Sequence, residues 1–136
     1  MQAGNVRFEY HHFIVVDGNA GGQESRRAAE ASECAKQQGK FWQYHDYLFS
    51  HQNGEGKGAF SDDNLKAFAV TLQLDATTFN TCLDTKATAK AVQQDEALAR
   101  SVGANQTPTV LVNSKLVQDP LNLTELQQLI DAALAQ

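Results

Sequence analysis

Two cysteines and one X-Pro step are the residues of this chain with the clearest potential for chemistry. The cysteines, Cys34 and Cys82, lie far apart in the sequence, and the chain has no Cys-x-x-Cys pair. A thiol becomes a good nucleophile when a cation or a helix N-terminus lowers its pKa, and nothing in the sequence places either feature beside these two. One interpretation is therefore a pair of buried thiols, because free cysteine is a common small core residue. A disulfide between them is the other.

The X-Pro step is Thr107-Pro108. It follows a polar link after Gly103 and opens the β-branched and aliphatic run Thr109–Val112. Proline lacks the N–H that a sheet ladder needs, and an X-Pro bond costs little to hold in the cis form. A cis bond here would turn the backbone sharply and leave main-chain groups open to another peptide. We predict a peptide-docking site at Thr107 and Pro108; the alternative is an ordinary trans proline at the start of an edge strand.

The four histidines are not predicted to bind a metal. His11 and His12 alternate along a predicted strand, so they point to opposite faces, and His51 stands alone. No Cys/His spacing is typical of zinc, so we expect neither a metal nor a cofactor. His45 and the aromatic residues near it are interpreted as helix packing, namely Phe41, Trp42, Tyr44 and Phe49.

Length and composition indicate one domain over residues 1–136 with a sizeable core. The net charge is −5 and the 11 basic residues are scattered, which argues against nucleic acid and anionic membranes as partners. No apolar run approaches the length of a membrane span, and no signal peptide precedes residue 1. Met1-Gln2-Ala3 leads directly into a strand pattern, so we expect the chain to open inside its fold.

Hydrophobic periodicity predicts a strand, a block of helices, a hairpin and a last helix. The alternation over Val6–Val16 predicts a long strand, and Asp17–Gly22 a break after it. Helices are expected at about Glu24–Gln38, at Phe41–Ser50, after the caps Ser61 and Asp75, and over Lys86–Val102. A hairpin of Pro108–Asn113 and Lys115–Gln118 turns at Asn113-Ser114, and Asn122 or Thr124 caps the last helix.

This order of elements is typical of the later part of a thioredoxin-type α/β fold. Within it, Ala28–Ala35 and Gln38–Phe49 resemble the helical insertion of DsbA-like thiol-disulfide oxidoreductases, in particular their BdbD-like branch. Val6–Phe13 is similar to the strand before that insertion, and Phe79–Leu83 and Gly103–Val112 complete a collinear match over most of the chain. The resemblance implies a single DsbA-like domain over 1–136 with a helical insertion at about 21–84.

The chain departs from the family at one important place. Family members carry a Cys-x-x-Cys pair on a helix upstream of the strand that corresponds to Val6–Val16, and this sequence has neither that helix nor the core strand before it. No catalytic residue is therefore assigned. The resemblance carries over Thr107 and Pro108 as substrate-binding residues of the loop that faces the dithiol. It also favours Cys34–Cys82 as a structural disulfide, because some DsbA-like proteins have such a second bridge and exported proteins oxidise their thiols.

Two functions are compatible with this resemblance. The first is a thiol-disulfide oxidoreductase of exported proteins, represented by a portion without its dithiol, with protein or peptide thiols and disulfides as partners. The second is a redox-inactive module that binds peptides or a partner. Whether the chain is an enzyme therefore stays open. Isomerases with the same insertion are a more distant alternative, since they need a cofactor site. An extracytoplasmic location is implied in either case.

The missing core strand would normally lie between the strand Val6–Val16 and the strand that starts at Pro108. Without it, both strands expose unpaired edges, which invite pairing with another chain. The chain is then either a fragment of a longer gene product or a protein whose second copy covers the edges. We accordingly expect a homodimer with an apolar interface that contains strands.

Overall fold

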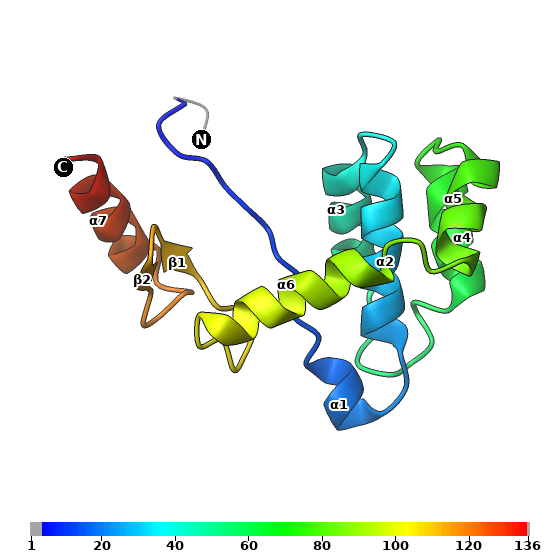
Figure 1. The fold of residues 1–136 in the computed structure, drawn as a ribbon, viewed down its shortest axis with the longest axis horizontal. Helices are drawn as coiled ribbons and strands as arrows, with labels where there is room; N and C mark the ends of the chain where they lie inside the picture. The colour runs from blue at the N-terminus through cyan, green and yellow to red at the C-terminus, as the bar shows by residue number, and fades with distance from the viewer. Residues whose placement is uncertain (1–3, 136) are drawn as a thin grey trace.

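The computed structural model describes residues 4–135, so the predicted chain start at residues 1–3, and residue 136, lie outside the described residues. Helices dominate this part, and its sheet has two short strands (Figure 1). In chain order the elements are α1 (Val16–Ala20), α2 (Glu24–Lys36), α3 (Phe41–His51), α4 (Asp62–Thr71), α5 (Ala76–Asp84), α6 (Ala89–Ser101), β1 (Leu111–Val112), β2 (Lys115–Leu116) and α7 (Leu123–Leu134).

Helix α2 is the centre of a helical bundle that we define as α2–α5. It packs against α3, α4 and α5, and also against α1 and α6. Its alanines Ala28, Ala31 and Ala35 are buried, and small side chains let neighbouring helices approach closely. The largest fully buried side chains of the bundle come from the other helices: Tyr44, Leu65, Phe79 and Leu83. The core of the molecule therefore lies in this bundle.

A network of ion pairs and hydrogen bonds around the buried Arg27 ties three helices of the bundle together. The guanidinium of Arg27 on α2 donates to both carboxylate oxygens of Asp62, at 2.8 and 2.6 Å, and to Glu30 at 2.5 Å. It also donates to the carbonyl of Leu83 near the end of α5, at 3.0 Å. A buried charge is tolerated when its hydrogen bonds are satisfied. Arg27 thereby fixes the start of α4 and the end of α5 on α2.

The predicted starts of α4 and α5 are confirmed by their caps. The side chain of Ser61 accepts a hydrogen bond from the N–H of Asn64, and that of Asp75 accepts one from the N–H of Thr78. Each cap satisfies a backbone donor that the first helical turn leaves without a partner. These local signals are strong enough to place both helices from the sequence.

The predicted long strand over Val6–Val16 is wrong. Residues 6–15 run as an extended segment that belongs to no sheet in the described part of the chain, and Val16 already begins α1. The predicted break at Asp17–Gly22 is also partly wrong, because α1 continues to Ala20. Asp17 accepts hydrogen bonds from the N–H groups of Ser25 and Arg26, so it stabilises the start of α2. A strand needs a neighbour for its backbone groups, and nothing in the described chain lies beside this segment to provide one.

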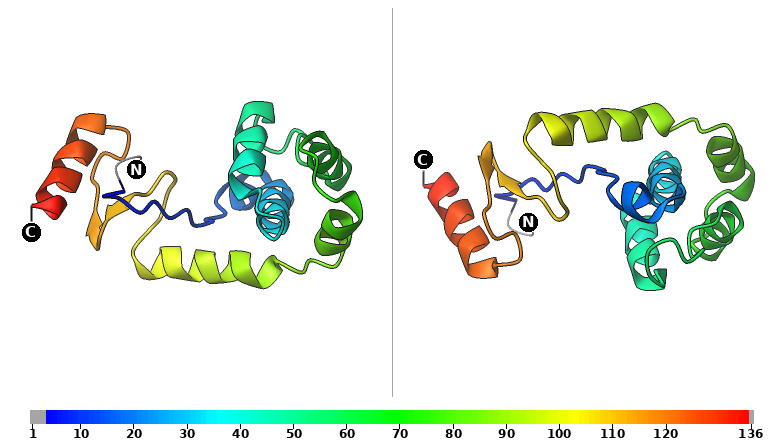
Figure 2. Two further views of the ribbon diagram at one scale, coloured as in Figure 1. Left: turned by 90° about the horizontal axis from the view of Figure 1, so that it is seen from above. Right: turned by 90° about the horizontal axis from the view of Figure 1, so that it is seen from below.

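We define the C-terminal unit as β1, β2 and α7. Its two strands are antiparallel and shorter than the predicted Pro108–Asn113 and Lys115–Gln118, while the turn at Asn113-Ser114 is as predicted, with Asn113 at a φ of +53°. Asn122 rather than Thr124 caps α7, since its side chain accepts from two N–H groups. Among the described elements α7 packs only against β1. Figure 2 shows the unit at the opposite end of the molecule from the bundle, with α6 between them.

The order of these elements is that of the later part of a thioredoxin-type fold. A helical insertion follows the extended segment, and then a helix, a hairpin and a last helix complete the chain. The predicted α/β class, without the first core strand and the catalytic helix, agrees with a mostly helical chain that keeps one small sheet.

Candidate functional site

The candidate docking site is the loop of residues 104–109, which we call the proline loop. It starts where α6 ends: Gly103 has a φ of +84°, a left-handed conformation that suits glycine, and the N–H of Ala104 donates to Ala99 at 2.9 Å. The peptide bond between Thr107 and Pro108 is cis. The loop then enters β1, so a helix end and a strand start together hold its two ends.

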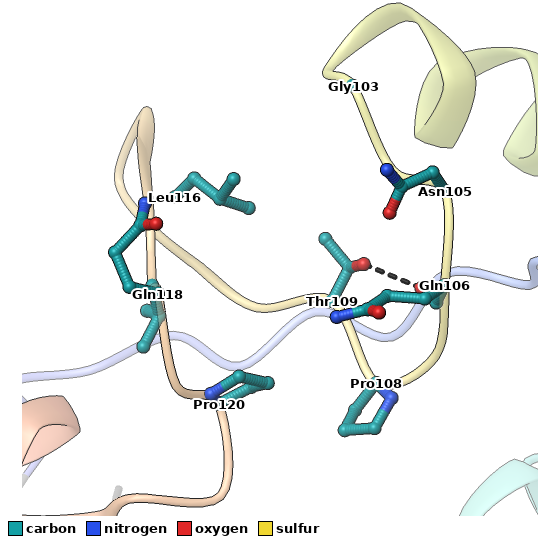
Figure 3. Close-up of a pocket in the computed structure, with 9 residues that line it drawn as sticks. Gly103, Asn105, Gln106, Pro108, Thr109, Leu116, Gln118 and Pro120 are labelled. Atoms are coloured by element: carbon teal, nitrogen blue, oxygen red, sulfur yellow. Dashed lines mark hydrogen bonds between the residues drawn. The ribbon is translucent and has the colours of Figure 1, made fainter.

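The proline loop forms one wall of a pocket of about 150 Å³. Figure 3 shows Asn105, Gln106 and Pro108 on one side of it and Leu116, Gln118 and Pro120 on the other. The hydroxyl of Thr109 donates to the carbonyl of Gln106 at 2.6 Å and braces the loop. The full lining is Gly103, Asn105, Gln106, Pro108, Thr109, Leu116, Val117, Gln118 and Pro120.

This lining offers amide groups and apolar carbon but no charge. All nine residues are uncharged at every ordinary pH. A cavity of this chemistry has no electrostatic preference for an anion or a cation. It suits a polypeptide, whose backbone amides pair with amide side chains while small side chains contact the prolines.

The main-chain groups of the proline loop are available for pairing. Thr107 and Pro108 are exposed, and within residues 4–135 the backbone N–H and C=O of Thr107, and the N–H of Thr109, have no hydrogen-bond partner. The ladder begins only at Val110, whose carbonyl accepts from Val117 at 2.9 Å. An extended peptide beside the loop would find both a donor and an acceptor in an edge-strand arrangement.

Cys34 and Cys82 are joined in a disulfide between α2 and α5, with their Cα atoms 5.9 Å apart. Both are buried, and Cys34 Sγ lies 3.8 Å from the hydroxyl of Thr88, which donates to the carbonyl of Glu30 at 2.8 Å. Neither α2 nor α5 packs against the strands or α7 in the described chain. The structure therefore does not bring the cysteines and the proline loop together, and the disulfide lies in the bundle core.

The two neighbouring histidines face different partners, as the alternation predicts. His11 Nδ1 lies 2.9 Å from a carboxylate oxygen of Asp95, whose other oxygen accepts from the backbone N–H of His12. His12 is buried, and its Nε2 lies 3.4 Å from both Glu33 Oε1 and the hydroxyl of Ser32. The hydrogen bond with His12 lowers the pKa of Glu33. Among the described residues no group of three His, Cys, Asp or Glu side chains has metal-binding geometry.

An aromatic surface that the sequence patterns did not predict lies between the extended segment and α3. The ring of Phe8 lies 5.6 Å from that of Trp42, and Tyr10 contacts Phe41 at 5.6 Å and His45 at 4.8 Å. The prediction that Phe41, Trp42, Tyr44 and Phe49 serve in helix packing is wrong for two of them, because Trp42 and Phe49 are 44% and 64% exposed. Phe8 beside them is 56% exposed. The helical spacing in the sequence could have revealed this surface. Positions 42, 45 and 49 lie on one face of α3, and Tyr44 and Leu48 lie on the buried face. We define the aromatic patch as the exposed Phe8, Trp42 and Phe49 together with the half-buried Tyr10, Phe41 and His45.

Comparison with known proteins places this geometry in a family context. A family model described as thioredoxin matches residues 1–132. Disulfide bond formation protein D of Bacillus subtilis is 28% identical over 134 residues, which is 96% of this chain and 58% of that protein. A Na(+)/H(+) antiporter NhaA 3 of Salinispora tropica is 31% identical over 131 residues, 96% of this chain and 19% of that protein.

A Na(+)/H(+) antiporter NhaA of Herminiimonas arsenicoxydans is 32% identical over 106 residues, 78% of this chain and 16% of that protein. The chain thus spans less than two thirds of each of these relatives. No solved structure matches it significantly. In the described residues no helix has both the length and the apolar character needed to cross a membrane.

Proposed function

The chain belongs to the thioredoxin family, and from this premise we propose that it is the peptide-docking portion of a thiol-disulfide oxidoreductase that acts on exported proteins. The similarity to Disulfide bond formation protein D supports the reaction class. The dithiol that performs the exchange is not among these 136 residues, because neither cysteine belongs to a Cys-x-x-Cys pair. The substrates in this proposal are protein or peptide thiols and disulfides.

The observation that carries this proposal is the proline loop with its unpaired main chain. Thr107 and Thr109 offer backbone groups at the mouth of an uncharged pocket, and a helix end and a strand hold them in position. An extended substrate paired there would have its backbone direction set independently of its sequence. Because the contacts are to backbone, such a site suits many different substrates.

The proline loop would position the substrate backbone during thiol-disulfide exchange. A thiolate of the dithiol attacks one sulfur of a substrate disulfide, forms a mixed disulfide and releases the other substrate sulfur as a thiolate. The second thiolate of the dithiol then attacks the mixed disulfide, so the substrate leaves reduced and the dithiol becomes oxidised; the reverse sequence oxidises a substrate. In both directions Thr107 and Pro108 hold the substrate backbone, and the Cys34–Cys82 bridge takes no part because it is buried.

An extracytoplasmic location is part of the same proposal. A structural disulfide persists in oxidising compartments and is rare in reducing ones, and Cys34 and Cys82 form one. Determining the redox state of these thiols in cells, by trapping them before lysis, tests the location directly. A chain recovered with both thiols free would contradict it.

One observation favours a second function, a redox-inactive binding module. Both cysteines of the chain are held in the bundle core, so the chain offers no accessible thiol of its own. In this alternative the proline loop binds extended segments of a partner and no sulfur exchange follows. Insulin reduction in the presence of dithiothreitol tests whether the chain itself exchanges sulfur. Under both functions we expect turnover no faster than the uncatalysed rate, because the two cysteines of the chain form a buried bridge. Robust turnover that disappears in Cys34→Ser would show that the bundle cysteines react.

Peptide binding is tested on the full chain with a labelled, extended decapeptide whose cysteine is S-methylated, so that no exchange occurs. NMR shifts should concentrate at Thr107 and Thr109, and Thr107→Arg should weaken binding at least tenfold because its bulk and charge obstruct the loop. Thr77→Arg on the exposed side of α5 is the matched control and should bind as the unsubstituted chain does. Equal binding by the two variants would refute docking at the proline loop.

A further inference from the structure

The extended segment Val6–Tyr10 has the properties of an unpaired strand. None of its backbone N–H and C=O groups has a hydrogen-bond partner within residues 4–135, and it runs without helix or sheet (Figure 1). The first backbone contact after it is the N–H of His12 to Asp95, at 3.0 Å. That contact and the aromatic side chains hold the segment on the molecule while its strand edges stay open.

Side chains alternate along this segment as they do along a strand. Phe8 and Tyr10 both contact Trp42, with ring centroids 5.6 and 6.2 Å away, so they share the face toward α3. Arg7 and Glu9 share the opposite face and form an ion pair at 2.7 Å, although their side chains are 84% and 55% exposed. The segment therefore has an aromatic face and a charged face, separated as the two-residue period requires.

The charge pattern of this segment is complementary to itself when it is read in reverse. In an antiparallel pair centred on Phe8, Arg7 lies opposite Glu9, Phe8 opposite Phe8, and Val6 opposite Tyr10. Residues directly opposite in an antiparallel pair have Cβ atoms about 4.5–5.5 Å apart, and opposite charges or aromatic and β-branched side chains there are favourable. We propose that two copies of this chain dimerise by antiparallel pairing of Val6–Tyr10 about a two-fold axis at Phe8.

The two-fold symmetry limits this assembly to two copies of the chain. A two-fold interface uses the same patch on both copies and closes after two. Arg7 then meets the partner's Glu9, and Glu9 meets the partner's Arg7, so the same ion pair forms once on each side of the axis. The same axis brings Phe8 and Trp42 beside the partner's Phe8 and the partner's Trp42, which covers these two exposed rings.

The other open edge of the fold is less suited to self-pairing. At the start of β1, Pro108 has no N–H to donate, and Thr109–Val112 carries no charge that would specify a register. A cross-pair of Val6–Tyr10 with that edge would place Arg7 and Glu9 against uncharged residues. Charge complementarity therefore favours pairing of the extended segment with the same segment of a second copy. This pairing does not require peptide docking at the proline loop, but it does require the edge of Val6–Tyr10 that the upstream core strand of DsbA-like proteins would occupy.

Charge reversal and charge exchange test the register. In Glu9→Arg, Arg7 would face the partner's residue 9 as a like charge at both ends, and the dimer dissociation constant should rise at least tenfold. In Arg7→Glu/Glu9→Arg the two charges exchange places, every opposite pair is restored, and dimerisation should return to within about threefold of the unsubstituted chain. Circular dichroism of each variant shows whether the fold is retained.

Mass and tryptophan emission are the two measurements. Analytical ultracentrifugation should give twice the chain mass of 14.9 kDa at micromolar concentration. Trp42 is the sole tryptophan, and its emission should shift to shorter wavelength as concentration rises through the dissociation constant, because dimerisation covers its ring. A monomer at all concentrations, a dimer unaffected by Glu9→Arg, or a double variant that stays monomeric would each overturn the proposal. Thr107→Arg should dimerise normally, so failure of this inference and failure of peptide docking are distinguishable.

Discussion

Removing the Cys34–Cys82 bridge should lower the stability of the helical bundle by several kcal/mol. The bridge closes a loop of 48 residues between α2 and α5. In the chain-entropy model a loop of this length contributes about 4 kcal/mol, because the cross-link restricts the unfolded chain. We therefore expect Cys34→Ala/Cys82→Ala to lose roughly this amount, which is a large part of the stability of a typical small domain at about 5–15 kcal/mol.

Equilibrium urea unfolding followed by circular dichroism measures this loss. With an m-value of about 2 kcal/mol/M, typical of a domain of this size, the unfolding midpoint should fall by about 2 M. The unsubstituted chain in excess dithiothreitol should show the same fall, which gives an independent value if the double variant does not fold. Thr81→Ala, an exposed substitution next to Cys82, is the matched control and should change the free energy of unfolding by less than about 0.5 kcal/mol.

Two results would refute this reasoning. A midpoint that falls by less than about 0.5 M would mean that the bridge does not restrict the unfolded chain as the loop length implies. Loss of peptide binding at the proline loop in the folded double variant would also count against it, because neither α2 nor α5 packs against the C-terminal unit in the described chain. A change in the m-value or in the heat capacity of unfolding would show whether the two cysteine substitutions altered the unfolded state.

Three further predictions concern single side chains. Tyr44→Phe should lower the free energy of unfolding by about 1–2 kcal/mol, because the buried hydroxyl donates to the carbonyl of Leu65 at 2.8 Å; urea unfolding measures this, and no change would mean that the bond is not formed. The Arg27 guanidinium lowers the pKa of Asp62 below its ordinary value of 3.8, so stability from this pair should be full above about pH 4–5 and be lost as the pH falls through the lowered pKa. Asp62→Asn should flatten that part of the pH profile, and an unchanged profile would contradict the assignment. Asn122→Ala should increase amide hydrogen exchange in the first turn of α7 and cost about 1 kcal/mol of local stability, since the side chain caps two N–H groups; unchanged exchange there would contradict the cap.

Local signals explain why most helices were predictable from the sequence. Ser61 and Asp75 cap their helices through side-chain contacts that reach only three residues along the chain. Such interactions depend on neighbours in sequence, so the sequence contains them in full. The thioredoxin family and the turn at Asn113 were predictable in the same way, from element order and short motifs.

Local sequence signals could not decide whether Val6–Val16 forms a strand. Its alternating residues describe a chain that fits a sheet, but a strand exists only when another chain segment satisfies its backbone. In the described residues no such neighbour is present, so the segment stays extended and packs through its side chains on α3. The exposure of Trp42 and Phe49 follows from the same cause, since nothing in the described chain covers that face.

Helices α2 to α7, the caps of α4 and α5, the position of the turn and the residue types of the proline loop follow from the amino-acid sequence, because these depend on contacts between near neighbours. The Cys34–Cys82 bridge was expected from the resemblance to DsbA-like proteins and is present in the structure. That Arg27 joins three helices, and that the proline loop lies away from the bundle core, follows only from the packing of the whole chain. These facts depend on distances between residues remote in sequence. Such distances are set by how the helices pack as a whole, and no local pattern records them.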